Sequence, residues 1–394
     1  MLRRLRSLIP TSPLPWHWHT NINRGLLAGI LALAAIGAVV SVLLQRDGDD
    51  EGEAAAPAPK ASPVVLKAVK GLTPRQKADS VVAAGIEPRA AKKEVSGAQL
   101  GGVVIGPDDW AAVGSALVKR VRAAGSSRGR IPPLVIGLHE GGVYRSYPDL
   151  PPAESQLDIG IDADSAAARA WSERTATALK RAGFDVNLAP LADVATLDSP
   201  VADRAFSDDP GLVSALTVAA VKGCKGTGLA CAVPHFPGLG AVSDDTDVSP
   251  ASVSLDRGSL RARDLAPFRA AFDAGAPATV LSLASYVAYD PVTPAALSPA
   301  VATGLLRGEL GFKGLAISDD LSAGSIAAGV GAPEAAVQAS AAGTDLAFVD
   351  DPALANQARA AILAAAKDGT LSLERLDAAA SRVLTLKKSL GLLP

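Results

Sequence analysis

The sequence predicts an α/β protein, and within that class a (β/α)8 barrel of the TIM type. From about residue 71 onward, short apolar runs bounded by turn residues alternate with longer, alanine-rich stretches of helical character. Continuous apolar runs are typical of strands buried on both faces, as in a parallel sheet. Alternation of this kind over roughly 300 residues suits a closed barrel, with an open doubly wound sheet as the alternative.

Seven apolar runs are expected to form strands. They are residues 101–106 (GGVVIG), 133–138 (PLVIGL), 184–194 (FDVNLAPLADV), 229–236 (LACAVPHF), 278–286 (ATVLSLASY), 314–321 (GLAISDDL) and 344–351 (TDLAFVDD). The segments between them, such as 164–181 and 210–221, are expected to be helices. Proline at the start of the second segment suits the first turn of a helix.

Polar side chains gather at the C-terminal ends of these runs, which favours the barrel. They are His139, Glu140, Asp193, His235, Tyr286, Asp319, Asp320, Asp350 and Asp351. A carboxylate after a strand is often only a helix cap, but capping alone does not explain the recurrence along successive strands. Because this end of a (β/α)8 barrel carries the active site, we expect these groups to converge there.

Composition and spacing exclude several classes of partner. The 394 residues include 38 Lys and Arg and 40 Asp and Glu, and the net charge of −2 gives no reason to expect nucleic acid. Only four histidines are present and no His/Cys spacing matches a zinc site, so no metal is expected. The glycine-rich segments lack a P-loop or dinucleotide fingerprint, and no cofactor is expected.

The N-terminal region predicts a location at the plasma membrane. Residues 25–44 form an uncharged apolar run of the length that a membrane-spanning helix needs. Arginines precede it and acidic residues follow it, which predicts a cytoplasmic segment over residues 1–24 and a barrel outside the membrane. A cleaved signal peptide is the alternative, although the run is long for one. Residues 45–70 are expected to be a disordered linker, and residues 71–394 the barrel domain.

The only two cysteines, Cys224 and Cys231, lie in the expected barrel. Outside the cytoplasm a disulfide is permitted, and the segment 225–229 between them could fold back to allow it. Two buried, small apolar side chains are an equally good interpretation.

Seven segments form a recognisable set. They are GLTPRQKA (71–78), HEGGVYRSYPDLPPA (139–153), NLAPLADV (187–194), RAFSDDP (204–210), HFPGLG (235–240), GFKGLAISDDLS (311–322) and RLDAAASRVLTLKKSLGL (375–392). As a set and in this order they resemble glycoside hydrolase family 3, and most closely its single-barrel β-N-acetylglucosaminidase branch. The resemblance implies one barrel, without the second α/β domain of longer relatives, and a carbohydrate as the substrate.

The resemblance further implies a two-step, retaining hydrolysis of a glycosidic bond. It places the nucleophile at Asp319, for which capping of the next helix is the alternative role. The branch takes its acid/base from an Asp-His pair in a loop that ends Asp-Ser-His. This chain has Asp245-Thr246-Asp247 there, so Asp245 and Asp247 are the catalytic candidates of the loop. Burial beside a second carboxylate raises the pKa of an Asp, which makes Asp247 a reasonable general acid and base.

Four other positions depart from the branch. Pro234 and Leu138 replace a Lys and an Asp that would bind the sugar, and Leu239 and Val143 replace a His and an Arg. Losing two charged hydrogen bonds weakens binding of the family's sugar by about a hundredfold or more. We therefore expect a specificity that differs from the family's usual one.

The retained polar residues of the motifs are expected to contact the carbohydrate: Arg204, His235, Glu140 and Asp193, with Tyr286 and Tyr144 as candidate stacking platforms. Each has an alternative role. His235 could be a buried core histidine, Arg204 could pair with Asp208 or Asp209, and the tyrosines could pack at the mouth of the barrel.

Two functions from different classes remain. The first is a membrane-anchored glycosidase that acts on a β-linked glycan, such as an N-acetylglucosamine-containing glycan of a cell wall. The retained Asp319 and the carboxylates of the loop favour it. The second is a catalytically inactive barrel that binds glycans or serves as a scaffold, which the five substitutions at the mouth favour.

Overall fold

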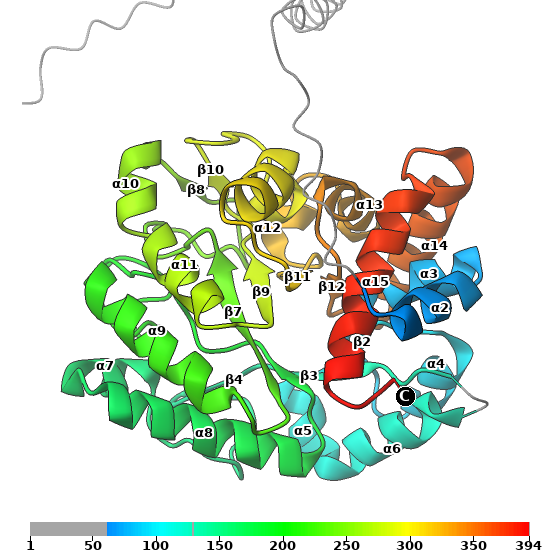
Figure 1. Cartoon of the computed structure of the whole chain (residues 1–394), viewed down its shortest axis with the longest axis horizontal. Coiled ribbons are helices and arrows are strands. Elements are labelled where there is room, and N and C mark those ends of the chain that lie inside the picture. Colours follow the sequence, from blue (N-terminus) through cyan, green and yellow to red (C-terminus); the bar gives the residue numbers. More distant parts are fainter. Residues whose placement is uncertain (1–60, 128–129, 394) are drawn as a thin grey trace, which may run out of the picture. The chain divides into compact units, whose positions relative to one another are not determined.

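The computed structural model describes residues 61–127 and 130–393 of the chain. In this part, eight parallel strands form one sheet in the order β11-β9-β7-β6-β3-β2-β1-β12. A parallel bridge between Ile317 of β11 and Leu346, next to β12, joins the two ends of the sheet. The result is a nearly closed barrel with helices around it (Figure 1), rather than an open doubly wound sheet.

The barrel strands are short, and every residue in them is buried. They are β1 (Val82–Ala84), β2 (Gly102–Ile105), β3 (Leu134–Gly137), β6 (Val186–Asn187), β7 (Ala230–Phe236), β9 (Ala278–Leu281), β11 (Leu315–Ser318) and β12 (Ala347–Val349). Seven of them fall within the expected runs. Strand β1 was missed because its three residues, VAA, continue the pattern of the preceding helix α3 (Pro74–Ser80).

Helices follow the strands along the chain and cover their outer side (Figure 1). The longer ones are α6 (Ser115–Gly125), α8 (Ser165–Ala182), α9 (Pro210–Cys224), α11 (Leu265–Asp273), the π-helix η3 (Ala300–Glu309), α13 (Ala332–Ala342), α14 (Pro352–Asp368) and α15 (Leu373–Ser389). Shorter ones are α4 (Ala91–Gly97), α5 (Pro107–Val113), α7 (Gln156–Asp162), α10 (Arg257–Ala262), η2 (Ala295–Leu297) and α12 (Gly324–Ala327). Helix α9 begins as expected, with Asp209 accepting a hydrogen bond from the Leu212 amide and Pro210 in the first turn.

Two small strand pairs lie outside the barrel sheet. Strands β4 (His139–Gly141) and β5 (Tyr144–Arg145) form an antiparallel hairpin directly after β3. Strands β8 (Ser252–Val253) and β10 (Ser285–Tyr286) pair in parallel after β7 and β9. Both pairs follow the C-terminal ends of barrel strands, so they build the rim on the side where a barrel enzyme carries its site.

Helix α15 fills the opposite end of the barrel. Its Val383 and Leu386 belong to the apolar cluster that fills the barrel interior. Lys387 is buried beside them and donates a hydrogen bond to the Leu100 carbonyl, just before β2 begins. The interior is therefore packed at the end where α15 lies, and a pocket opens at the other end, beside the C-terminal ends of the strands.

Part of the predicted linker is helical. Helix α2 (Pro63–Gly71) occupies the end of the predicted linker, residues 45–70. Ser62 caps it, and Val65 and Val69, four residues apart on one face, are buried. The predicted cytoplasmic segment (1–24), the apolar run (25–44) and the linker up to residue 60 lie outside the described residues.

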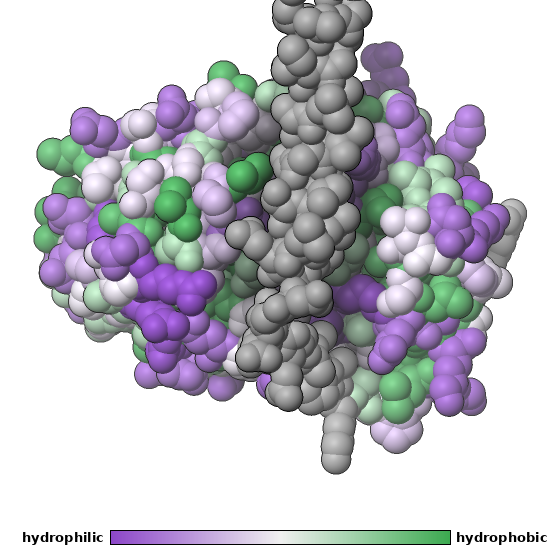
Figure 2. Space-filling model, turned by 90° about the horizontal axis from the view of Figure 1, so that it is seen from above, coloured by the Kyte–Doolittle hydropathy of each residue, from purple (hydrophilic) through white to green (hydrophobic). Residues whose placement is uncertain are grey.

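The structure corrects the predicted localisation at the plasma membrane. Across residues 61–127 and 130–393, none of the helices combines the length and the apolar character that crossing a bilayer requires. The part of the surface visible in Figure 2 carries hydrophilic and hydrophobic side chains interspersed, as on helices that bury one stripe and hydrate the other. The prediction rested on the apolar run over 25–44, outside this part of the chain, and nothing in the structure supports it.

Cys224 and Cys231 form a disulfide, with their Cα atoms 6.3 Å apart. The bond ties the end of α9 to β7, and both cysteines are buried. The structure thereby decides between the two interpretations of these residues.

Replacing Cys224 and Cys231 together by Ala is expected to lower the free energy of unfolding by about 2 kcal/mol, because the crosslink restricts the unfolded chain. Urea unfolding of the variant and of the wild type, each with and without a reducing agent, measures the loss. The reducing agent should destabilise the wild type by a similar amount and leave the variant unchanged. An unchanged wild-type midpoint under reduction would contradict the expectation.

Candidate active site

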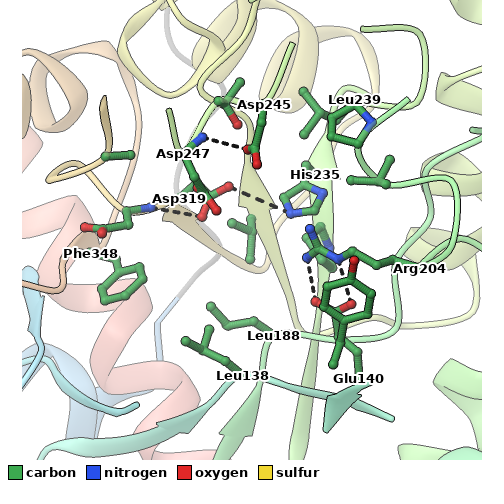
Figure 3. A pocket seen from close by; sticks show the side chains of 18 of the residues that line it. Leu138, Glu140, Leu188, Arg204, His235, Leu239, Asp245, Asp247, Asp319 and Phe348 are labelled. Atoms are coloured by element: carbon green, nitrogen blue, oxygen red, sulfur yellow. Dashed lines mark hydrogen bonds and ion pairs between the residues drawn. The ribbon is translucent and has the colours of Figure 1, made fainter. Parts of the chain in front are cut away.

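A pocket of about 330 Å³ lies at the C-terminal ends of the barrel strands (Figure 3). Its volume is within the range of small-molecule sites. The apolar part of its lining includes Leu138, Leu188, Val280 and Phe348. The charged part consists of Glu140, Asp245, Asp247, Asp319, Asp320, Asp350, Arg204 and His235. Most of the residues expected at this face thus share one cavity.

Asp193 holds His235 in place from behind the pocket. Its carboxylate is fully buried and accepts hydrogen bonds from His235 Nδ1 at 2.7 Å and from the His235 amide at 3.3 Å. The other ring nitrogen, Nε2, faces Asp319 Oδ2 at 3.8 Å. The imidazole therefore stands between a buried carboxylate and a carboxylate of the pocket.

The end of β7 places both Pro234 and His235 in the pocket because the strand is irregular there. Val233 and Phe236 both face the outer core, although strict alternation would put residues three apart on opposite faces. The pairing with β9 slips by one residue between them, as in a β-bulge. The bulge turns the two intervening residues toward the cavity, which the sequence did not reveal.

The environment of His235 favours its charged form. Burial by itself lowers the pKa of an imidazole, but the adjacent charges of Asp193 and Asp319 and the hydrogen bond to Asp193 outweigh burial and raise the pKa of His235. Both carboxylates thus stabilise the protonated form of His235.

Arg204 and Glu140 form a bidentate ion pair on one wall of the pocket. The Arg204 Nε and Nη2 atoms lie 2.9 Å and 2.6 Å from the two Glu140 oxygens. Burial disfavours the guanidinium charge, yet the Glu140 carboxylate raises the pKa of Arg204 overall, so the guanidinium stays charged. The alternative partners considered for Arg204, Asp208 and Asp209, do not pair with it.

Tyr144 is the tyrosine that lines the pocket. Its ring lies beneath the Arg204 guanidinium, 5.2 Å from centroid to Cζ, and its hydroxyl donates to Asp203. The predicted substrate contact at Tyr286 is wrong, because that residue is fully buried and does not line the pocket. Its side chain packs under the loop after β7, where its hydroxyl donates to the Gly238 carbonyl at 3.0 Å.

The loop that carries Asp245 and Asp247 is fastened at its start by Asp193. The Leu239 amide donates to Asp193 Oδ1 at 2.7 Å, and the Thr196 amide donates to the Gly240 carbonyl at 2.8 Å. A Cβ on Gly240 would collide with the Val194 carbonyl, so this close approach of backbones requires glycine. The second glycine of HFPGLG thus has a packing role.

The far side of the same loop is fastened to the turn that follows Asp319. The Gly324 amide donates to the Asp247 carbonyl at 2.9 Å, and the Ser325 amide donates to the Thr246 carbonyl at 3.3 Å. A side chain on Gly324 would collide with the Val248 carbonyl. These contacts fix the backbone at Asp247 relative to the end of β11, so the positions of Asp247 and Asp319 depend on each other.

The carboxyl group of Asp247 has an unusually high pKa for an aspartate. Although the residue is exposed at the mouth of the pocket, desolvation of its carboxyl group, followed by the charges of Asp319 and Asp245, raises the pKa of Asp247 to about 6. Asp245 accepts a hydrogen bond from the Asp247 amide at 2.9 Å, which orients the loop locally. Asp247 is thus a carboxyl group that exchanges its proton near neutral pH, next to the carboxylate of Asp319.

Two further acids line the pocket that the motifs did not single out. The Asp350 residue after β12 has its pKa raised to about 6, by desolvation first and then by the charge of Asp320. Asp320 itself accepts hydrogen bonds from Ser322 and from the Asp350 amide, so it shapes the turn after Asp319. In the sequence, only their positions after apolar runs indicated that Asp320 and Asp350 lie at the site.

Other polar residues at strand ends have structural roles. His139 is fully buried, accepts from the Tyr147 amide and faces the Pro151 carbonyl, and burial lowers its pKa to about 4. Asp351 caps helix α14 through the amides of Ala353 and Leu354. The expectation that His139 and Asp351 would lie in the pocket was therefore wrong.

The fold and the site together define a class. Carboxylates from the loop after β7 and from the end of β11 meet in one pocket at the C-terminal face of a barrel, the arrangement of a barrel glycosidase. The chain belongs to glycosyl hydrolase family 3, because the profile of the N-terminal domain of that family matches residues 74–386.

Known relatives agree with this assignment. The chain is 37% identical, over 241 residues, to a β-hexosaminidase of Stenotrophomonas maltophilia, a match that covers 59% of this chain and 71% of the relative. Among solved structures, it resembles a family 3 β-N-acetylglucosaminidase from Paenibacillus sp. with a TM-score of 0.79 and 30% identity, over 82% of this chain and 63% of that one. A β-N-acetylhexosaminidase from Beutenbergia cavernae matches with a TM-score of 0.73 and 29% identity, over 80% and 99%. These similarities support a glycosidase.

Replacing Asp193 by Asn is expected to lower the pKa of His235, because burial then acts on the imidazole without the charge that opposes it. An NMR titration of the histidine ring protons measures the change. The wild-type midpoint should lie above 6.5, the ordinary value, and the variant midpoint below the wild-type one. Asp368→Asn, an exposed carboxylate at the end of α14, is the control and should leave the titration of His235 unchanged.

Proposed function

We propose that the chain is a retaining glycosidase for a β-linked hexosaminide, in which Asp319 is the nucleophile and Asp247 the general acid and base. The observation that supports this most directly is that both carboxyl groups line one pocket, where desolvation and then the charge of Asp319 raise the pKa of Asp247. The names of the relatives support the class of substrate. An N-acetylglucosamine-containing glycan of a cell wall remains a prediction.

In the first step, an Asp319 oxygen attacks the anomeric carbon while the bond to the leaving oxygen breaks. Asp247, protonated, gives its proton to that oxygen, and the sugar remains as an ester on Asp319. In the second step, Asp247 takes a proton from water, the water oxygen attacks the same carbon, and Asp319 leaves as a carboxylate. Asp247 ends protonated, ready for the next cycle.

The electrostatics of the pocket suit both roles of Asp247. In the free enzyme the Asp319 charge helps to keep Asp247 protonated near pH 6, as an acid requires. Once the sugar esterifies Asp319, that charge disappears and the pKa of Asp247 falls, as a base requires. Hydrogen bonds fasten the loop that carries Asp247 to the turn after Asp319, and they keep the two carboxyl groups in one arrangement through both steps.

The remaining polar groups position the sugar. His235, held by Asp193, lies beside the nucleophile and orients the Asp319 carboxylate. The Arg204–Glu140 pair forms a wall on which sugar hydroxyls can find both donors and acceptors, with Tyr144 beside it as an apolar face. Asp193 is a positioning residue, since it reaches the pocket only through His235.

An activated 5-fluoro hexosaminide is expected to trap Asp319 as a covalent ester, because the fluorine slows both steps while the good leaving group keeps the first step faster than the second. Mass spectrometry of peptides from the treated protein should locate the adduct on Asp319. Asp320→Asn, at the neighbouring carboxylate, should still be labelled at Asp319, whereas Asp319→Ala should not be labelled. Folded protein that forms no adduct across a panel of hexosaminides would instead favour the inactive, glycan-binding barrel.

Replacing Asp247 by Ala is expected to lower kcat about 10²- to 10⁴-fold for substrates with poor leaving groups, because proton donation is lost. With an activated aryl leaving group, the first step should persist, and added azide should restore turnover by replacing the activated water. In the wild type, kcat/KM should fall as pH rises above about 6, since Asp247 then loses its proton. If kcat/KM of the Asp247→Ala variant still falls as the pH rises above about 6, Asp247 is not the acid.

A further inference from the structure

The pocket has two chemically different sides. Four apolar side chains form what we call the apolar floor: Leu138, Leu188, Val280 and Phe348. Three of them belong to the cluster that fills the barrel interior, and the fourth, Leu138, packs against it. In Figure 3, Leu138 and Leu188 lie on the side of the pocket opposite Asp245 and Asp247.

The backbone of the apolar floor offers little to a hydroxyl group. At Leu138, the amide donates to Tyr147 Oη at 3.3 Å and the carbonyl accepts from Ser146 Oγ. At Phe348, the amide donates to Ser318 Oγ and the carbonyl accepts from the Leu321 amide, both at 2.9 Å. The Leu188 amide donates to the Gly137 carbonyl at 2.9 Å. These backbone groups are thus committed within the protein.

Ser146 adds no hydrogen-bond donor to the apolar floor. It lines the pocket, but its hydroxyl proton is given to the Leu138 carbonyl, so that only an acceptor remains. The charged groups that can bind hydroxyls stand on the walls, on Glu140, Arg204 and the carboxylates around Asp319. A sugar placed with its anomeric carbon at Asp319 therefore meets polar partners along one side and hydrocarbon on the other.

We propose that Leu138 and the apolar floor select a sugar that presents a deoxy position, or one capped by an alkyl or acyl group, away from the anomeric carbon. This inference rests on the proposed function. A hydroxyl buried against the floor loses its hydrogen bonds to water without replacement, whereas a methyl or methylene group gains contact with apolar surface. One such misplaced hydroxyl reduces affinity about tenfold or more.

Binding of matched sugars to the Asp319→Ala protein tests the inference apart from catalysis. The ligands are the methyl β-glycoside of N-acetylglucosamine and its 3-, 4- and 6-deoxy analogues, and calorimetry gives each Kd. At least one deoxy analogue should bind about tenfold more tightly than the parent. If every analogue binds no better than the parent, or none of the four sugars binds, the inference is overturned.

Substitutions at Leu138 in the same Asp319→Ala background show whether this residue is responsible. Leu138→Asp restores a hydroxyl partner and should shift the ratio of Kd values toward the parent sugar by tenfold or more, whereas Leu138→Met keeps an apolar side chain and should retain the preference. Thermal unfolding and circular dichroism of both variants establish that they fold. An unchanged ratio in folded Leu138→Asp would overturn the role of Leu138. Trapping of Asp319 with an activated glycoside decides the proposed catalysis separately.

Discussion

The arrangement of the site depends most on the buried carboxylate of Asp193. A charge without access to water is tolerated only where hydrogen bonds and an opposite charge compensate it. Asp193 meets this requirement with the His235 ring, the His235 amide and the Leu239 amide. These bonds orient the imidazole and also fix the start of the loop that carries Asp247. One buried residue thereby connects two walls of the pocket.

The same need for compensation explains how the charges of the pocket are arranged. Arg204 pairs with Glu140, and His235 pairs with Asp193 and also faces Asp319. Desolvation, followed by the charges of Asp319 and Asp245, raises the pKa of Asp247. In the family motif that the sequence resembles, an imidazole stands at this position, and here a carboxyl group with a pKa of about 6 takes its place. In the proposed mechanism, the substitution preserves a group that can donate a proton near neutral pH.

Much of the fold and a part of the site could be predicted from residues alone. The apolar runs located seven barrel strands, and Asp209 with Pro210 located the start of α9, because burial and capping act over a few residues. Tyr286 and His139 illustrate the limit. Both follow strands, as Asp319 does, yet one supports the loop at Gly238 and the other is buried beside Tyr147. The direction of a side chain at a strand end is set by neighbouring segments, which lie far away in the sequence.

Local patterns of burial and residue types were enough to predict a parallel α/β fold, the family motifs and the chemical identity of the groups at the strand ends. They did not establish that Cys224 and Cys231 are joined, that a bulge turns His235 inward, or that Leu138 belongs to the apolar floor. Each of these depends on the packing of segments that are distant along the chain or on the register between strands. Neither is encoded in a short stretch of residues, because the same stretch can face either side of a sheet.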